Sequence, residues 1–87
     1  MKYEVRILRV AEKEMDKLSA TVHRRLSQRI LSLEENPRPR GARKLSGSEE
    51  YRLRIGAYRI LYTVNDVDKL VTIVAVGHRR EVYRCRA

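Results

Sequence analysis

Hydrophobic residues recur along the chain at two spacings, which divide it into a first strand, a helical stretch and a longer region of strands. Tyr3, Val5 and Ile7 alternate with charged residues. A period of two is typical of a β-strand that buries one face. The sequence therefore predicts a first strand within residues 2–7.

Two apolar stripes at helical spacing follow this strand. They are formed by Ala11, Met15 and Leu18 and by Val22, Leu26, Ile30 and Leu33. Ser19 can end the first helix and cap the second. Asn36-Pro37 stops the second helix after residue 35, because a residue before proline disfavours the helical region. We expect the two helices to form an antiparallel hairpin.

From residue 51 the spacing returns to two. One face of the predicted strands carries Tyr51, Leu53, Ile55, Tyr58, Ile60, Tyr62 and Val64. The other face carries Arg52, Arg54 and Arg59, and a tight turn at 56–57 joins the two strands. Residues 70–76 are apolar and largely β-branched, which predicts a central strand that is buried on both faces and ends at Gly77.

This order of elements predicts an α+β fold over a single domain, residues 1–87. The topology is β-α-α-β-β-β, or has one more short strand within residues 36–47. An N-terminal helical hairpin packs on a small, mostly antiparallel sheet. A chain of 87 residues suits one domain with a modest core.

Charge points to an anionic partner. The chain has 20 Lys and Arg against 11 Asp and Glu, a formal net charge of +9. Such a protein favours nucleic acid, because each neutralised phosphate releases counterions. The alternatives are that the charge serves solubility or binds an acidic protein. Residues 36–47 contain Arg38, Arg40, Arg43 and Lys44 with no acid among them. This segment is either a solvated connection or an edge that contacts phosphates.

Several classes of site are not expected. One cysteine cannot form an internal disulfide, and His23 and His78 lie too far apart for zinc-ligand spacing. No phosphate-binding glycine motif occurs, so we expect no metal and no cofactor. The longest apolar run is far shorter than the ~20 residues of a membrane helix. A cytoplasmic protein without membrane contact is expected.

The arginines of residues 51–59 are the candidate chemistry. If the tyrosine-bearing faces pack on the helices, Arg52, Arg54 and Arg59 gather on the open face of the sheet. Arginine stays charged and holds phosphate with a planar fork of donors. Clustered arginines stabilise the transition state of phosphoryl transfer. The alternative is that they form only the wet face of an antiparallel sheet.

Two stretches carry a resemblance to a known family. KLSGSEEYRLRIGAYRILYTV, residues 44–64, and VTIVAVGHRREVYR, residues 71–84, resemble the RelE/ParE toxin superfamily, and within it the RelE-type endoribonucleases. The resemblance implies a RelE-like fold and a toxin of a type II toxin–antitoxin system. Such toxins enter the ribosomal A site and cleave mRNA there without a metal, by attack of a ribose 2′-hydroxyl on its own phosphate. The implied partners are a cognate antitoxin, in a hetero-oligomer, and the ribosome with its mRNA.

The resemblance also assigns roles to residues. Arg52 and Arg54 stand at a basic pair, often lysines, of which the first is linked to activating the 2′-hydroxyl and the second to phosphate charge. Arginine almost never gives up its proton. Arg52 would therefore hold the phosphate or lower the pKa of the hydroxyl. Arg59 would stabilise the transition state, Arg79 would contact phosphate or help protonate the leaving 5′-oxygen, and Tyr83 would orient or stack on the base.

Further residues are secondary candidates. His78, beside Arg79, could act as a general acid or base. The expected RNA-binding residues are Arg40, Arg43, Lys44 and Arg80. Two other functions stay open: a ParE-like toxin that binds DNA gyrase without nuclease chemistry, and a plain RNA- or DNA-binding module.

Overall fold

The elements follow the predicted order of a strand, two helices and further strands. The computed structural model describes residues 2–45, 47 and 49–78. Its elements are β1 (Glu4–Ile7), α1 (Arg9–Asp16), α2 (Ala20–Ser32), β2 (Ala42–Lys44), β3 (Glu50–Ile55), β4 (Tyr58–Asn65) and β5 (Leu70–His78). The predicted α+β fold is confirmed, and the optional strand within residues 36–47 is β2.

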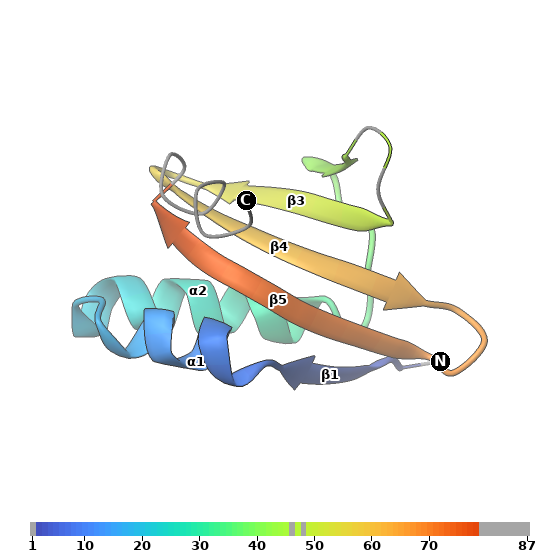
Figure 1. Ribbon diagram of the computed structural model, residues 1–87, viewed down its shortest axis with the longest axis horizontal. Coiled ribbons are helices and arrows are strands. Elements are labelled where there is room, and N and C mark those ends of the chain that lie inside the picture. The colour runs from blue at the N-terminus through green and yellow to red at the C-terminus, as the bar shows by residue number, and fades with distance from the viewer. Residues whose placement is uncertain (1, 46, 48, 79–87) are drawn as a thin grey trace.

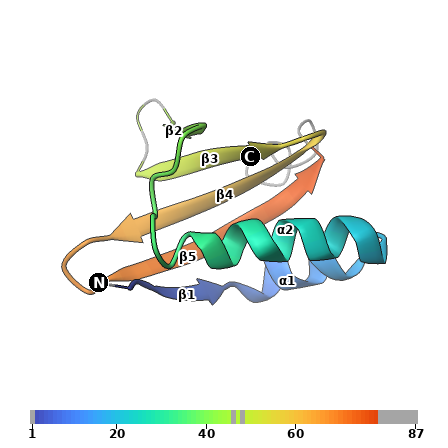
Figure 2. The same cartoon turned by 180° about the vertical axis from the view of Figure 1, so that it is seen from behind.

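The strands of the described residues form one sheet in the order β1-β5-β4-β3-β2 (Figure 1). β1 pairs with β5 in parallel, and the other neighbours pair antiparallel. Figure 2, seen from behind, shows α2 in front of β5, so that the helices cover one face of the sheet. The other face carries no helix of the described chain.

Three predictions about β5 were wrong. The central position belongs to β4, because β1 and β2 extend the sheet on either side. Burial of β5 is also uneven: Val71 and Ile73 beneath the helices are fully buried, whereas Thr72 and Val74 are half-buried. The helices cover only one face of the sheet, which explains this difference in burial. Gly77 does not end the strand, which continues to His78.

The helical hairpin is close to its prediction. The Ser19 hydroxyl accepts a hydrogen bond from the Val22 amide at 3.3 Å, which confirms the predicted cap of α2. α2 ends at Ser32 and not at residue 35. The amides of Leu33 and Glu34 bond to carbonyls three residues earlier, so the chain has already left the α-helical pattern there.

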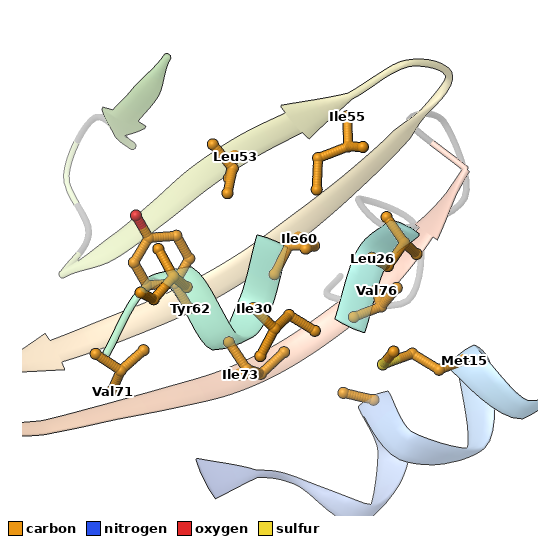
Figure 3. Close-up of a cluster of buried hydrophobic side chains, with 12 residues drawn as sticks. Met15, Leu26, Ile30, Leu53, Ile55, Ile60, Tyr62, Val71, Ile73 and Val76 are labelled. Atoms are coloured by element: carbon orange, nitrogen blue, oxygen red, sulfur yellow. The ribbon is translucent and has the colours of Figure 1, made fainter. Parts of the chain in front are cut away.

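One apolar core joins the helices to the sheet (Figure 3). It contains Ala11, Met15, Leu26, Ile30, Leu33, Leu53, Ile55, Ile60, Tyr62, Val71, Ile73 and Val76. The hydroxyl of Tyr62 donates to the Pro37 carbonyl at 2.8 Å, which satisfies the one polar atom of this aromatic side chain. Burial raises the pKa of Tyr62 to about 12. None of the described helices is long and apolar enough to cross a membrane.

Candidate nucleic-acid interface

A tight hairpin sets two arginines side by side. β3 and β4 are joined by Gly56 and Ala57, and Ile55 pairs with Tyr58 next to this turn. Gly56 has a φ of 60°, a conformation that a two-residue hairpin requires and that glycine adopts without strain. The next pair of residues is Arg54 and Arg59, which therefore lie directly opposite each other.

Two more arginines extend this group. Arg52 is opposite Leu61 on β4 and opposite Arg43 on β2. The residues that alternate with these arginines, such as Leu53 and Ile60, pack in the core beneath the helices. The arginines therefore occupy the opposite face. We call this surface the arginine face; it is formed by Arg43, Arg52, Arg54 and Arg59.

The arginine face places like charges opposite each other. Arg54 faces Arg59 and Arg43 faces Arg52 across neighbouring strands. Like charges directly opposite each other in a sheet are destabilising. An anion placed between the guanidiniums would replace this repulsion with attraction. Each pair of arginines in register presents two sets of donors from which one phosphate can accept.

An apolar floor lies among these arginines. Leu61 is 0% exposed and Ala75 is 3% exposed, and Leu45 and Val74 pack against them. A bulge creates this arrangement: Leu61 pairs with Ala75 but Tyr62 pairs with Ile73, so Val74 is an extra residue in β5. A low-dielectric floor strengthens the interaction of nearby guanidiniums with an anion.

Arg59 is a partly enclosed member of the arginine face. Its side chain is partly buried, and its Nε atom is shielded from solvent. Gly77 is its partner on β5 and has no side chain. The glycine that was predicted to end the strand thus lies beside this arginine.

Arg38 has a structural task instead. Its Nη1 and Nη2 atoms donate to Asp66 at 3.1 and 2.8 Å, and its Nε donates to the Tyr51 hydroxyl at 2.9 Å. Tyr3 also donates to Asp66 at 2.6 Å. The hydrogen bonds from Arg38 and then from Tyr3 lower the pKa of Asp66 to about 2. We call these hydrogen bonds among Arg38, Tyr51, Asp66 and Tyr3 the Arg38 clamp. They tie the segment before β2 to the turn between β4 and β5.

The other predicted RNA-binding residues divide between two faces. Arg43 belongs to the arginine face. Lys44 pairs with Tyr51, so it lies on the side of the sheet that the helices cover. Arg40 is exposed in the turn before Gly41, which has a φ of 97°. The structure therefore brings one of these three residues to Arg52 and Arg54.

His78 is turned away from the arginine face. It pairs with Tyr58, and the two rings make an edge contact with centroids 6.1 Å apart. Tyr58 packs against the helix-side core. His78 therefore does not share a face with Arg52, Arg54 and Arg59. Arg79, Arg80 and Tyr83 lie outside the described residues.

One carboxylate shares the arginine face and was missed from the sequence. Glu50 begins β3 and pairs with Thr63, which places it on the same side of the sheet as Arg52. The alternation that grouped the arginines also indicates this glutamate. Within residues 2–45, 47 and 49–78, no three His, Cys, Asp or Glu side chains are grouped as ligands of a metal ion.

Comparison with known proteins connects this architecture to a family. The sequence profile of the family described as the ParE toxin of the type II toxin–antitoxin system parDE matches residues 5–83. The chain is 37% identical over 78 residues to the mRNA interferase toxin RelE of Escherichia coli K12. That alignment covers 84% of this chain and 81% of the relative.

Solved structures share the fold. The archaeal RelE–RelB complex of Pyrococcus horikoshii OT3 contains a chain with a TM-score of 0.81 and 34% identity, over 91% of this chain and 97% of that one. The intact RelBE toxin–antitoxin complex of E. coli contains a chain with a TM-score of 0.76 and 30% identity, over 87% and 95%. The likeness in sequence and in fold extends over most of the chain.

Proposed function

The chain belongs to the RelE/ParE superfamily of toxins from type II toxin–antitoxin systems, and from this premise we propose that it is a ribosome-dependent endoribonuclease that cleaves mRNA in the A site. The observation that carries the proposal is the arginine face, where two pairs of arginines oppose each other over an apolar floor. The name of the E. coli relative, an mRNA interferase, supports the same reaction.

The proposed chemistry is an internal transesterification that needs no metal. The ribose 2′-hydroxyl attacks the adjacent phosphate and leaves a 2′,3′-cyclic phosphate and a 5′-hydroxyl. Arg52 and Arg54 hold the phosphate, and Arg59 stabilises the charge that develops in the transition state. Arg79 contacts the phosphate or helps protonate the leaving 5′-oxygen, and Tyr83 orients or stacks on the base.

Arginine suits these tasks for a physical reason. Its guanidinium keeps its charge at any physiological pH and presents donors in a fixed plane. Arg54 and Arg59 are neighbours across the hairpin, so one phosphate can accept from both. The rigid two-residue turn fixes their separation before substrate arrives, which lowers the cost of organising the site.

The flanking basic residues extend the RNA contact. Arg43 continues the arginine face onto β2, and we assign Arg40, Lys44 and Arg80 to contacts with backbone phosphates of mRNA or ribosomal RNA. Such contacts position a ligand without reading its sequence. Binding to ribosomes is then expected to weaken as salt rises, since each phosphate contact releases counterions.

A cognate antitoxin is the proposed protein partner. Two of the structural relatives are toxin–antitoxin complexes. A chain with a formal net charge of +9 attracts an acidic segment, which can fold as it binds. We propose that toxin and antitoxin form a hetero-oligomer in the cytoplasm, where the ribosomes are.

A second function has one observation in its favour. The matching family profile is that of ParE toxins, and a ParE-type toxin would bind DNA gyrase and cut no RNA. The two functions differ in what they require of the arginine face. The nuclease needs Arg59 for its chemistry. Gyrase binding has no such requirement for this half-buried arginine.

Expression in bacterial cells tests the proposal. Wild-type protein is expected to arrest growth and protein synthesis, and Arg59→Ala is expected to restore both. Arg24→Ala, which removes an exposed arginine from α2, is the matched control and should remain toxic. Folded Arg59→Ala protein that still arrests growth, with DNA replication as the first process to stop, would support the gyrase alternative instead.

A further inference from the structure

The proposed reaction needs a proton acceptor that the arginines cannot provide. Attack by the 2′-hydroxyl releases a proton, and a positioned base typically contributes about 10²–10⁴-fold to such a rate. Arg52 stands where the family resemblance places the group that activates this hydroxyl. A guanidinium remains protonated in proteins, so it binds phosphate but accepts no proton.

Glu50 lies next to Arg52 on the same face. Residues two apart on a strand point the same way, with Cα atoms about 7 Å apart. Across the sheet from Glu50 is Thr63 of β4, which carries no charge. Among the described residues of this face, Arg52 lies two positions along the same strand, and Arg43 of β2 is opposite Arg52. Both side chains are positively charged.

The backbone holds Glu50 in place. Its carbonyl accepts a hydrogen bond from the Leu45 amide at 2.8 Å, which links the start of β3 to the segment after β2. Its side chain is partly buried, in contrast to the exposed Glu49 one residue earlier. In the described residues of β2, β3 and β4, Glu50 is the one carboxylate. A phosphate bound by Arg52 brings its ribose within reach of this group.

We propose that Glu50 accepts the proton of the attacking 2′-hydroxyl, an assignment that rests on the proposed function. The 2′-oxygen forms a bond to phosphorus while its proton passes to the Glu50 carboxylate. The bond from phosphorus to the 5′-oxygen breaks, and that oxygen takes a proton from water. The resulting hydroxide removes the proton from Glu50, so the enzyme is regenerated and no water is consumed.

Removing this carboxylate separates catalysis from binding. Glu50→Gln takes a negative charge from a face that binds a polyanion, so its affinity for ribosomes should be equal or higher. Its rate of cleavage should nevertheless fall by roughly 10²-fold or more. A loss of rate without a loss of affinity is the signature of a proton acceptor, and a merely structural role would weaken both.

The experiment is single-turnover cleavage of mRNA on programmed ribosomes, measured from acidic to alkaline pH. The wild-type rate is expected to fall at low pH, and Glu50→Gln should be slow and lack this decline. Glu50→Asp should recover part of the rate. Glu49→Gln, a neighbouring carboxylate outside the site, should behave as wild type. Ribosome affinity and thermal unfolding are measured for each variant.

Three results would overturn the inference. Glu50→Gln that cleaves at the wild-type rate, with the wild-type pH profile, would overturn it and leave the proposed function standing. A slow variant that also binds ribosomes more weakly, or that melts early, would assign Glu50 to structure. Wild-type protein that leaves ribosome-bound mRNA intact would overturn the proposed function and this assignment together.

Discussion

The neighbours of each arginine decide what that residue does. Arg38 is held by Asp66 and Tyr51 in a set of directed hydrogen bonds, and these bonds raise its pKa further. Its charge is satisfied within the fold. Arg54 and Arg59 face each other across the hairpin. An anion bound between two guanidiniums in register is attracted by both.

The Arg38 clamp predicts how stability depends on pH. The pKa of Asp66 is lowered from 3.8 to about 2, chiefly by the hydrogen bonds from Arg38. A group with a lowered pKa in the folded state contributes stability above its unfolded pKa, near pH 4, and loses it as pH falls toward about 2. Asp66→Asn should therefore reduce the free energy of unfolding near neutral pH and flatten its decline between about pH 4 and 2.

Urea unfolding across that pH range measures both effects. Asp68→Asn is the matched control, because Asp68 lies in the same turn but bonds to Asn65 and leaves the Arg38 clamp intact. An Asp66→Asn variant whose stability declines as steeply as that of the wild type would show that the clamp does not carry this dependence.

A helix side chain completes an edge of the sheet. β1 pairs with β5 as far as Ile7 opposite Ile73, and no pairing to β1 is formed by Val76. The Val76 amide donates instead to Glu14 Oε1 of α1 at 3.0 Å. Glu14 thus satisfies a backbone donor that a longer β1 would have satisfied. This contact fixes α1 next to the bulged half of β5.

Glu14→Ala is expected to lower the free energy of unfolding by about 1–3 kcal/mol, because a partly buried amide loses a charged acceptor. Glu14→Gln keeps an acceptor oxygen and should lose less. Urea denaturation measures the difference, and amide hydrogen exchange at Val76 should be faster in the alanine variant. Equal stability of wild type and Glu14→Ala would contradict this account of the edge.

The elements that could be predicted are those with a clear period. Alternation assigned Leu53 and Ile60 to the core and the arginines to the open face, and helical spacing found both helices. β5 has no such period, since residues 70–76 are apolar throughout. A uniform strand carries little information about its register. The bulge at Val74 and the extension through Gly77 therefore have no signal in the sequence.

At the scale of the whole molecule, the two faces of the sheet have separate tasks. The helices and the core lie on one side and hold the strands in register (Figures 1 and 2). The arginine face on the other side is then a rigid platform. Strand alternation placed Arg52, Arg54 and Arg59 on one face, and the family resemblance predicted roles for them. They missed Glu50, whose significance depends on its sheet neighbours and not on charge or composition.

The separation of faces also explains which predicted residues moved away from the site. Lys44 follows Arg43 in the sequence, and His78 follows Gly77, the strand partner of Arg59. Successive side chains of a strand point to opposite faces, so both residues lie on the helix side. A single residue of offset along a strand reverses the direction of a side chain. Basic character alone could not distinguish Arg43 from Lys44.

The central claim is that the arginine face cleaves RNA, and the rate of mRNA cleavage on programmed ribosomes tests it most directly. Wild-type protein should cut the A-site codon and leave a 2′,3′-cyclic phosphate and a 5′-hydroxyl. Arg59→Ala should be slower by about 10²–10³-fold, the loss typical of one group that stabilises a transition state, while Arg24→Ala keeps the wild-type rate. Folded Arg59→Ala protein that cleaves as fast as the wild type would contradict the claim.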